Sequence, residues 1–346
     1  MSKLAVVLFN LGGPDSPAAV RPFLFNLFND PAIIGAPGPV RWALAQLISR
    51  RRAPVAQHIY ARLGGKSPLL EQTQSQARAL EGALSGAADE VRAFIAMRYW
   101  HPMTAETVAA VKAFAPDRVV LLPLYPQYSG TTSGSSLKAW RQEAARQGLG
   151  APAVEVCCWP TAPGWIDAMA QRVAAAVHKM GAHGEPRVLF SAHGLPKKVI
   201  AAGDPYQWQV ERTAAAVVDR MALPGLDWQV CYQSRVGPLE WIGPSTDAEI
   251  RRAGGDGVPV VLVPIAFVSE HSETLVELDE EYRDLAEAEG VTGFHRVPTV
   301  SSDPVFIAGL ADLVRGALAG GCAPCSQDGG RLCPQGLGVC PNQQQR

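Results

Sequence analysis

Short apolar runs alternate along the chain with longer stretches of helical pattern, and this alternation constrains the fold more than any other feature. The runs have the length of strands, and the stretches between them are long enough for crossover helices. Such alternation indicates βαβ units with parallel strands. We expect strands at residues 4–10, 92–99, 118–124, 154–158, 186–192, 228–233 and 259–266, with crossover helices at 70–84, 104–114, 164–179, 206–222 and 272–288.

Two apolar segments of the first half recur in the second half in the same order. Residues 119–124 (VVLLPL) resemble 260–265 (VVLVPI). Residues 8–14 (LFNLGGP) resemble 189–196 (LFSAHGLP) with one residue inserted. We therefore infer an α/β protein with two similar lobes and a cleft between them.

The length of the chain suits two lobes of ordinary size, because 346 residues exceed what one small core organises. Residues 159–164 (WPTAPG) break the alternating pattern. We place the first lobe at residues 1–160, the second at 161–320, and a tail at 321–346.

Charge and hydropathy exclude several classes of protein. The chain has 31 Lys and Arg against 32 Asp and Glu, so we expect no nucleic-acid partner. No apolar run approaches the roughly 20 residues of a membrane span. The run at 4–9 leads into residues 10–15 (NLGGPD) without a signal-peptide cleavage site, so we interpret it as the first strand. We expect a cytoplasmic protein with reduced cysteines.

Residues 31–55 combine large apolar side chains with arginines, and we call this segment the flap. It can be an amphipathic element whose apolar side meets a greasy substrate or the inner face of a membrane. It can equally be a helix packed on its own lobe with a solvated basic end. The residues concerned are Ile33, Ile34, Trp42, Leu44, Leu47 and Ile48, with Arg41, Arg50, Arg51 and Arg52.

Two segments carry groups suited to chemistry at strand ends and helix starts, where open α/β folds gather their ligands. Residues 191–196 (SAHGLP) place His193 where a buried strand should end. Residues 271–279 (HSETLVELD) open a helix after the apolar run at 260–267. An imidazole facing such a helix suits metal handling and proton removal together.

The helix that begins near residue 272 is rich in carboxylates. Glu273 and Glu277 are four residues apart and share one face, which Glu280 or Glu281 extends by a turn. Like charges at this spacing repel unless a cation or solvent relieves them. The pattern therefore indicates a cation or proton site, with an exposed acidic helix as the alternative.

Three loops combine aromatic side chains with a few hydrogen-bonding groups, which is typical of a pocket for a flat, largely apolar ligand. They are residues 97–102 (MRYWHP), 124–135 (LYPQYSGTTSGS) and 233–244 (QSRVGPLEWIGP). The chain lacks both a P-loop ending and a Gly-x-Gly-x-x-Gly after its first strand, so we expect no nucleotide site.

Four of the seven cysteines lie in the tail with the spacing Cys-x2-Cys-x7-Cys-x6-Cys. In an intracellular protein a thiolate quartet indicates an iron–sulfur cluster or zinc before disulfides, and a disordered reduced tail is the remaining alternative. We interpret Cys231 as a buried strand residue, and leave open whether Cys157 or Cys158 is a ligand. The four tail cysteines are Cys322, Cys325, Cys333 and Cys340.

Eight segments together closely resemble the ferrochelatase family in the same order along nearly the whole chain. They are residues 10–14 (NLGGP), 60–68 (YARLGGKSP), 98–99 (RY), 123–129 (PLYPQYS), 191–193 (SAH), 203–206 (GDPY), 233–238 (QSRVGP) and 271–275 (HSETL). The resemblance implies two Rossmann-like lobes around a porphyrin cleft, and a lyase that inserts Fe²⁺ into protoporphyrin IX in haem biosynthesis. Family members occur as monomers and as homodimers.

The resemblance also implies roles for particular residues. His193 and Glu273 match the paired metal and proton site of the family, and Glu277, Glu280 and Glu281 match the region of its acidic track. Bacterial members with a cysteine-rich tail imply that the four tail cysteines bind a [2Fe–2S] cluster. The porphyrin contacts expected are Leu11, Arg62, Tyr125, Ser129 and Trp241.

Three other functions remain alternatives at this point. A coproporphyrin ferrochelatase would act on a substrate with four carboxylates and favour more basic residues near the propionate pocket. A haem or porphyrin carrier would keep the cleft without needing a base at His193. An electron-transfer protein would explain the tail alone, but not the chelatase motifs.

Overall fold

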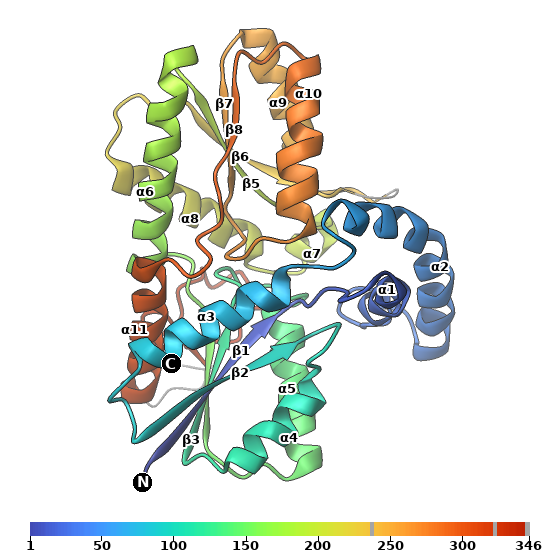
Figure 1. Cartoon of the computed structure of the whole chain (residues 1–346), viewed down its shortest axis with the longest axis vertical. Coiled ribbons are helices and arrows are strands. Elements are labelled where there is room, and N and C mark those ends of the chain that lie inside the picture. The colour runs from blue at the N-terminus through green and yellow to red at the C-terminus, as the bar shows by residue number, and fades with distance from the viewer. Residues whose placement is uncertain (236–238, 321–323, 343–346) are drawn as a thin grey trace. The chain divides into compact units, whose positions relative to one another are not determined.

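The computed structural model describes residues 1–235, 239–320 and 324–342, and it divides into two compact units (Figure 1). Some of the motif at 233–238, and Cys322, lie outside the described residues. The last long helix, α11 (Pro304–Gly320), contributes residues to both units. The first unit is Met1–Tyr125, Ser129–Cys158 and Ala311–Gly329, and the second is Pro126–Tyr128, Trp159–Leu310 and Gly330–Arg346.

The first unit is built on a parallel five-stranded sheet in the order β2-β1-β3-β4-β9. Its strands are β1 (Lys3–Asn10), β2 (Glu90–Met97), β3 (Arg118–Pro123), β4 (Ala153–Cys158) and β9 (Cys325–Ser326). Its helical elements before α11 are η1 (Pro17–Ala19), α1 (Val20–Phe28), α2 (Gly38–Arg62), α3 (Leu69–Ala83), α4 (Thr104–Phe114) and α5 (Ser133–Gln147).

Strand β1 is buried on both faces, as expected for a central strand of a parallel sheet. Every second residue of β1, Ala5, Val7 and Phe9, packs against α4 and α5. The ring of Phe9 meets the ring of Trp140 edge-on at 5.8 Å. These contacts fix the end of β1 and the start of α5 against each other.

The second unit is built on a parallel four-stranded sheet in the order β6-β5-β7-β8. Its strands are β5 (Arg187–His193), β6 (Trp228–Gln233), β7 (Val260–Pro264) and β8 (Phe294–Arg296). Its helical elements besides α11 are α6 (Pro163–Met180), η2 (Gly181–His183), α7 (Lys197–Ala201), α8 (Tyr206–Met221), α9 (Thr246–Asp256), η3 (Glu273–Glu281) and α10 (Tyr282–Ala288).

The expected helix at 272–288 begins with a π-helical segment, η3, and continues as the α-helix α10. π-Helical turns are rare and often lie at functional sites. Leu278 of η3 and Tyr282 of α10 pack into the core with Leu189 and Leu262 of the sheet. This packing anchors the inner face of the segment and fixes the strand-to-helix join at Glu273.

The α/β class with two parallel sheets flanked by helices is confirmed, and all seven expected strands are present. The sequence analysis missed β8 and β9, which have only three and two residues. Such short segments show no period of their own. Strand β8 forms by pairing with the edge of β7, and β9 forms by pairing with the edge of β4.

The flap forms a turn followed by most of helix α2, which packs against α1 through Ala53 and Tyr60 (Figure 1). Elsewhere the helix exposes large apolar side chains, with Trp42 55% and Val55 65% accessible. Packing on its own unit and exposure of large apolar side chains therefore occur in the same helix. None of the helices in the described part of the chain has the length and apolarity needed to cross a bilayer.

Candidate functional site

His193 and Glu273 form a pair at the carboxyl edge of the second sheet. His193 is the last residue of β5, and Glu273 is the first residue of η3. The imidazole Nδ1 lies 2.9 Å from a carboxylate oxygen of Glu273. Both side chains are partly exposed, at 40% and 25%. Because Nδ1 faces the carboxylate, Nε2 is the ring nitrogen directed away from Glu273.

The two members of this pair shift each other's protonation. Burial disfavours the charged imidazole, but the negative charge of Glu273 outweighs that effect and raises the pKa of His193. Burial likewise opposes ionisation of Glu273, yet His193 lowers the pKa of Glu273 to about 2. The pairing therefore favours the imidazolium form of His193 and the carboxylate form of Glu273.

Glu277 lies next to this pair, and its pKa is raised where that of Glu273 is lowered. Its carboxyl accepts hydrogen bonds from the backbone N–H of Ser234 at 2.9 Å and the hydroxyl of Ser234 at 2.6 Å. Burial and the charge of Glu273 nevertheless raise the pKa of Glu277 to about 7. A carboxyl that titrates near neutrality can take up and release a proton under physiological conditions.

Ser234 is a site residue that the sequence analysis did not single out. It follows β6 with a φ of +58°, a left-handed conformation that is uncommon for a serine. Its N–H and hydroxyl both point at Glu277. The only available signal was its place in the motif at 233–238.

The remaining two carboxylates of the expected acidic track lie at the far end of η3. Glu280 is half-buried and Glu281 is exposed. The structure thus brings His193, Glu273 and Glu277 together, and carries Glu280 and Glu281 on the same helix away from the imidazole.

Trp241 lies beside the loop that follows His193. Residues Pro196 and Trp241 form an isolated β-bridge. A Cβ added to Gly194 would stand 3.4 Å from the indole of Trp241 and 2.9 Å from the carbonyl oxygen of Gln233. Only glycine allows this close approach, so the residue after His193 brings the aromatic ring against the loop.

The other four expected porphyrin contacts belong to the first unit. Leu11 is half-buried just after β1, and Arg62 is exposed at the end of α2. Tyr125 and Ser129 follow β3, and the hydroxyl of Ser129 lies 2.8 Å from that of Thr131. Burial raises the pKa of Tyr125 well above its ordinary value of 10.0, which keeps the phenol neutral.

A buried charge network in the first unit was also missed. Asp30 is 4% exposed and accepts from the guanidinium of Arg98 at 2.7 Å, the hydroxyl of Ser135 at 2.6 Å and the phenol of Tyr99 at 2.9 Å. Burial opposes ionisation, but these donors together lower the pKa of Asp30. The network ties the segment before the flap to the end of β2 and the start of α5.

The described tail cysteines lie in two places. Cys333 and Cys340, in the second unit, are buried and reduced. A hydrogen bond with Cys333 lowers the pKa of the Cys340 thiol to about 6, and Arg331 adds to the effect. Cys325, in β9 of the first unit, is disulfide-bonded. Among the described residues there is no group of three or more His, Cys, Asp or Glu side chains arranged to hold a metal.

The three other cysteines are buried in strands. Cys157 and Cys158 are neighbours in β4 with sulfurs 3.5 Å apart. Cys231 lies in the core of the second unit, where burial raises the pKa of its thiol to about 12. Its position matches the expected buried strand residue.

Comparisons with known proteins point to one family. A family model described as Ferrochelatase matches residues 3–318. The ferrochelatase of Caulobacter vibrioides is 58% identical over 98% of this chain and 97% of its own length. The ferrochelatase of Phenylobacterium zucineum is 56% identical with the same coverage of both chains. The solved structure of SirB from Bacillus subtilis with Fe³⁺ covers 93% of this chain and 97% of its own, with a TM-score of 0.52 and 14% identity, and it shows the fold.

Proposed function

The chain belongs to the ferrochelatase family and is a lyase, and on this premise we propose that it inserts Fe²⁺ into protoporphyrin IX to form protohaem. The observation that carries the proposal is the family match over residues 3–318. The pairing of His193 with Glu273 supplies the residues for the chemistry.

Metal insertion requires both a cation site and a base. Two porphyrin N–H protons must leave as Fe²⁺ enters, and these nitrogens are too weakly acidic to release protons to neutral water. A positioned proton acceptor is therefore needed. Imidazole and carboxylate oxygens also hold Fe²⁺ less firmly than thiolates would, which suits an ion that must be passed on.

We assign both tasks to His193 and Glu273. Glu273 raises the pKa of His193 and so strengthens the imidazole as a proton acceptor. A metal ion needs the unprotonated imidazole, so Fe²⁺ and a proton compete for the pair. Glu277, with a pKa of about 7, is placed to take up the displaced proton, and Glu280 and Glu281 continue the acidic track.

We also assign the porphyrin contacts to the loops that end the strands. Trp241 provides an aromatic wall next to His193. Leu11, Tyr125 and Ser129 follow β1 and β3, and the exposed guanidinium of Arg62 is suited to a propionate. Bending of the macrocycle by such contacts would expose nitrogen lone pairs to the metal.

The assay is anaerobic incubation of the full chain with protoporphyrin IX and Fe²⁺, followed by haem absorbance. We expect haem with the parent and with His178→Ala, an exposed histidine of α6, and no haem with His193→Ala. Turnover of coproporphyrin alone would correct the substrate. Tight haem binding with equal activity of parent and His193→Ala would favour a carrier.

We propose further that Cys322, Cys325, Cys333 and Cys340 bind a [2Fe–2S] cluster. Support comes from the buried Cys333 and Cys340 thiols, whose mutual hydrogen bond favours a thiolate. Arg331 donates to the carbonyl oxygens of Cys333, Pro334 and Leu337 and so orders the loop between these two sulfurs. When bound, the cluster supplies a one-electron redox centre and a cross-link of the tail.

The spectrum of the purified protein tests this ligand set. We expect visible bands that Cys333→Ser removes and Cys231→Ser leaves intact. Since a sulfur in a disulfide cannot ligate iron, the disulfide at Cys325 must be reduced before loading. A colourless protein holding zinc would replace the cluster with a structural metal.

For the flap, we propose peripheral contact with the inner face of a membrane from the cytoplasmic side. Helix α2 exposes large apolar side chains, among them Trp42 and Leu47, 55% and 46% accessible, and it carries three consecutive arginines at 50–52. Co-sedimentation with anionic vesicles should fall on Trp42→Ser and stay unchanged on His58→Ser. Equal binding of both variants would assign the exposed apolar side chains of α2 to another role.

A further inference from the structure

Ser234 connects two carboxylates of the site in the second unit. Its hydroxyl lies 2.6 Å from one carboxylate oxygen of Glu277 and 3.5 Å from the oxygen of Glu273 that faces His193. Its backbone N–H donates to the other carboxylate oxygen of Glu277 at 2.9 Å. These contacts therefore form a continuous line from the imidazole through Glu273 and Ser234 to Glu277.

The position of the Glu277 carboxylate depends on Ser234. Negative charge on Glu277 is repelled by Glu273, which lies four residues earlier in η3. The phenol of Tyr282 also faces Glu277, but at 3.4 Å it lies beyond the usual range of an O–H···O hydrogen bond. Among the described residues, Ser234 therefore supplies the two short donors that hold Glu277 against this repulsion.

The backbone of Ser234 is arranged for these two contacts. The residue follows β6 with a φ of +58°, a left-handed conformation that residues other than glycine seldom adopt, and such strain gathers at functional sites. This conformation turns both the N–H and the hydroxyl toward Glu277. The preceding Gln233 pairs with His193 in the sheet, and its carbonyl oxygen accepts from the N–H of Gly194 at 2.9 Å. Ser234 is therefore held in register with the imidazole.

We propose that Ser234 is a positioning residue, which uses its N–H and its hydroxyl to hold Glu277 beside the pair of His193 and Glu273. The inference rests on the proposed function, in which Glu277 takes up the proton displaced from this pair. Without the hydroxyl, one of the two short contacts is lost, and the carboxylate of Glu277 is free to turn away from Glu273. Proton uptake then slows, because the rate of such a step depends steeply on the placement of the acceptor.

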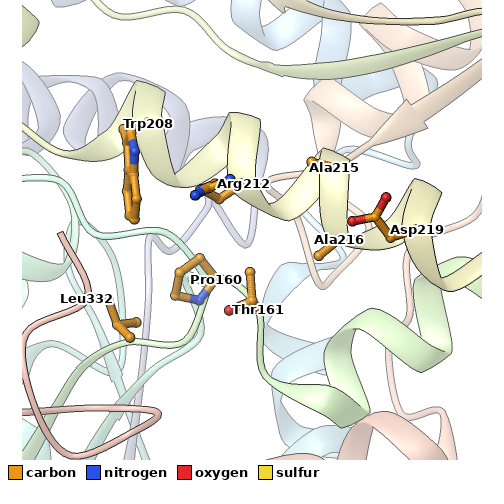
Figure 2. Close-up of a pocket in the computed structure, with 8 residues that line it drawn as sticks. All are labelled: Pro160, Thr161, Trp208, Arg212, Ala215, Ala216, Asp219 and Leu332. Atoms are coloured by element: carbon orange, nitrogen blue, oxygen red, sulfur yellow. The ribbon is translucent and has the colours of Figure 1, made fainter. Parts of the chain in front are cut away.

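A pocket on α8 offers a reference point in the same unit (Figure 2). Trp208, Arg212 and Asp219 of α8 line it, together with Thr161 from the loop after β4. In the described part of the chain, none of the residues lining this pocket forms a hydrogen bond or ion pair with Ser234 or Glu277. Thr161→Val therefore removes a hydroxyl from the second unit without changing the contacts of Glu277.

The test compares two serines of the second unit that share a left-handed backbone, using the full chain. Ser234→Ala removes the hydroxyl and keeps the N–H. Ser234→Gly does the same and relieves the backbone strain, so it remains informative if the alanine variant does not fold. Ser301, with a φ of +47°, receives the same two substitutions as the matched control. Thr161→Val is the second control.

The readouts are kcat and the KM for Fe²⁺ in the anaerobic haem assay, and the ratio of kcat in H₂O to kcat in D₂O. We expect both Ser234 variants to lose kcat by roughly 10–100-fold and to keep the KM for Fe²⁺. Their solvent isotope effect should rise, because proton transfer becomes slower. The Ser301 and Thr161 variants should match the parent in all three quantities.

The other outcomes separate the inference from the proposed function. An unchanged kcat in the Ser234 variants of an active parent would overturn the inference alone. A lower kcat with an unchanged isotope effect would show a merely structural role, and a higher KM at an unchanged kcat would assign Ser234 to metal binding; either result would also overturn it. A parent that forms no haem would overturn the proposed function, and the inference with it.

Discussion

Strands β1 and β5 occupy corresponding positions in the two sheets, yet their carboxyl ends carry different chemistry. β1 ends at Asn10, which is 6% exposed. Its neutral amide is satisfied by Thr73 at 3.1 Å and by the N–H of Leu11 at 2.9 Å. β5 ends at His193, whose side chain is 40% exposed and paired with Glu273. The same scaffold position is structural in one unit and charged in the other.

The difference arises from the helix that follows the neighbouring strand of each sheet, β3 beside β1 and β7 beside β5. After β3 the helix α5 begins with small neutral side chains, among them the buried Ser133 and Ser136. After β7 the π-helical segment begins with Glu273 and carries Glu277 one turn later. Two similar sheets can therefore hold one ordinary core and one cluster of charged side chains, because the residues at the helix start determine which charges meet the strand end.

Replacing the charged strand end should have the largest effect. His193→Ala removes the proposed base and metal ligand, so we expect metal insertion to fall by about 10²–10⁴-fold, the range typical of a general base. Porphyrin binding, followed by fluorescence quenching, should change little. Turnover within a few-fold of the parent would show that the two strand ends are more alike than we infer.

The partner carboxylate should matter somewhat less. Glu273→Gln keeps the size of the side chain and removes its charge, so the pKa of His193 should fall and Fe²⁺ should bind more weakly. We expect insertion to drop by roughly 10²-fold, measured as haem formed over a range of Fe²⁺ concentrations. An unchanged dependence on Fe²⁺ would place the metal route elsewhere.

Replacing Asn10, at the end of β1, should lower the stability of the protein and leave its activity unchanged. Asn10→Ala leaves the hydroxyl of Thr73 and the N–H of Leu11 without their amide partner. We expect a loss of about 1–3 kcal/mol in the free energy of unfolding, measured in urea, with insertion per folded molecule retained. A large loss of turnover in folded protein would give Asn10 a chemical role as well.

The fold was predictable where hydrophobic pattern sets structure locally. The run at residues 4–10 became β1 (Lys3–Asn10) because a central parallel strand must be apolar on both faces. Strand β9 gave no signal, since its pairing depends on the edge of β4. The π-helical form of η3 was equally hidden, because the spacing of its glutamates is compatible with an α-helix.

The site was predictable where a strand end and a helix start meet. That logic brought His193, Glu273 and Glu277 together, whereas their catalytic roles stay predictions. Ser234 escaped because its contact with Glu277 depends on a left-handed backbone. Asp30 was missed because an isolated aspartate in the sequence does not reveal the three donors, distant along the chain, that surround it.

The smallest and sharpest difference between the two helix starts should be their response to pH. Burial and Glu273 raise the pKa of Glu277 from 4.5 to about 7, so between these values the native protein binds a proton that the unfolded chain has released. The contribution of Glu277 to stability therefore falls as pH rises through this window. Glu277→Gln does not titrate, so the Tm of the variant relative to the parent should rise between pH 5 and pH 8. Ser133→Ala, at the start of α5, should shift the Tm by the same amount at both pH values. Parallel Tm curves for parent and Glu277→Gln would mean that the start of η3, like the start of α5, contributes no pH-dependent stability in this range.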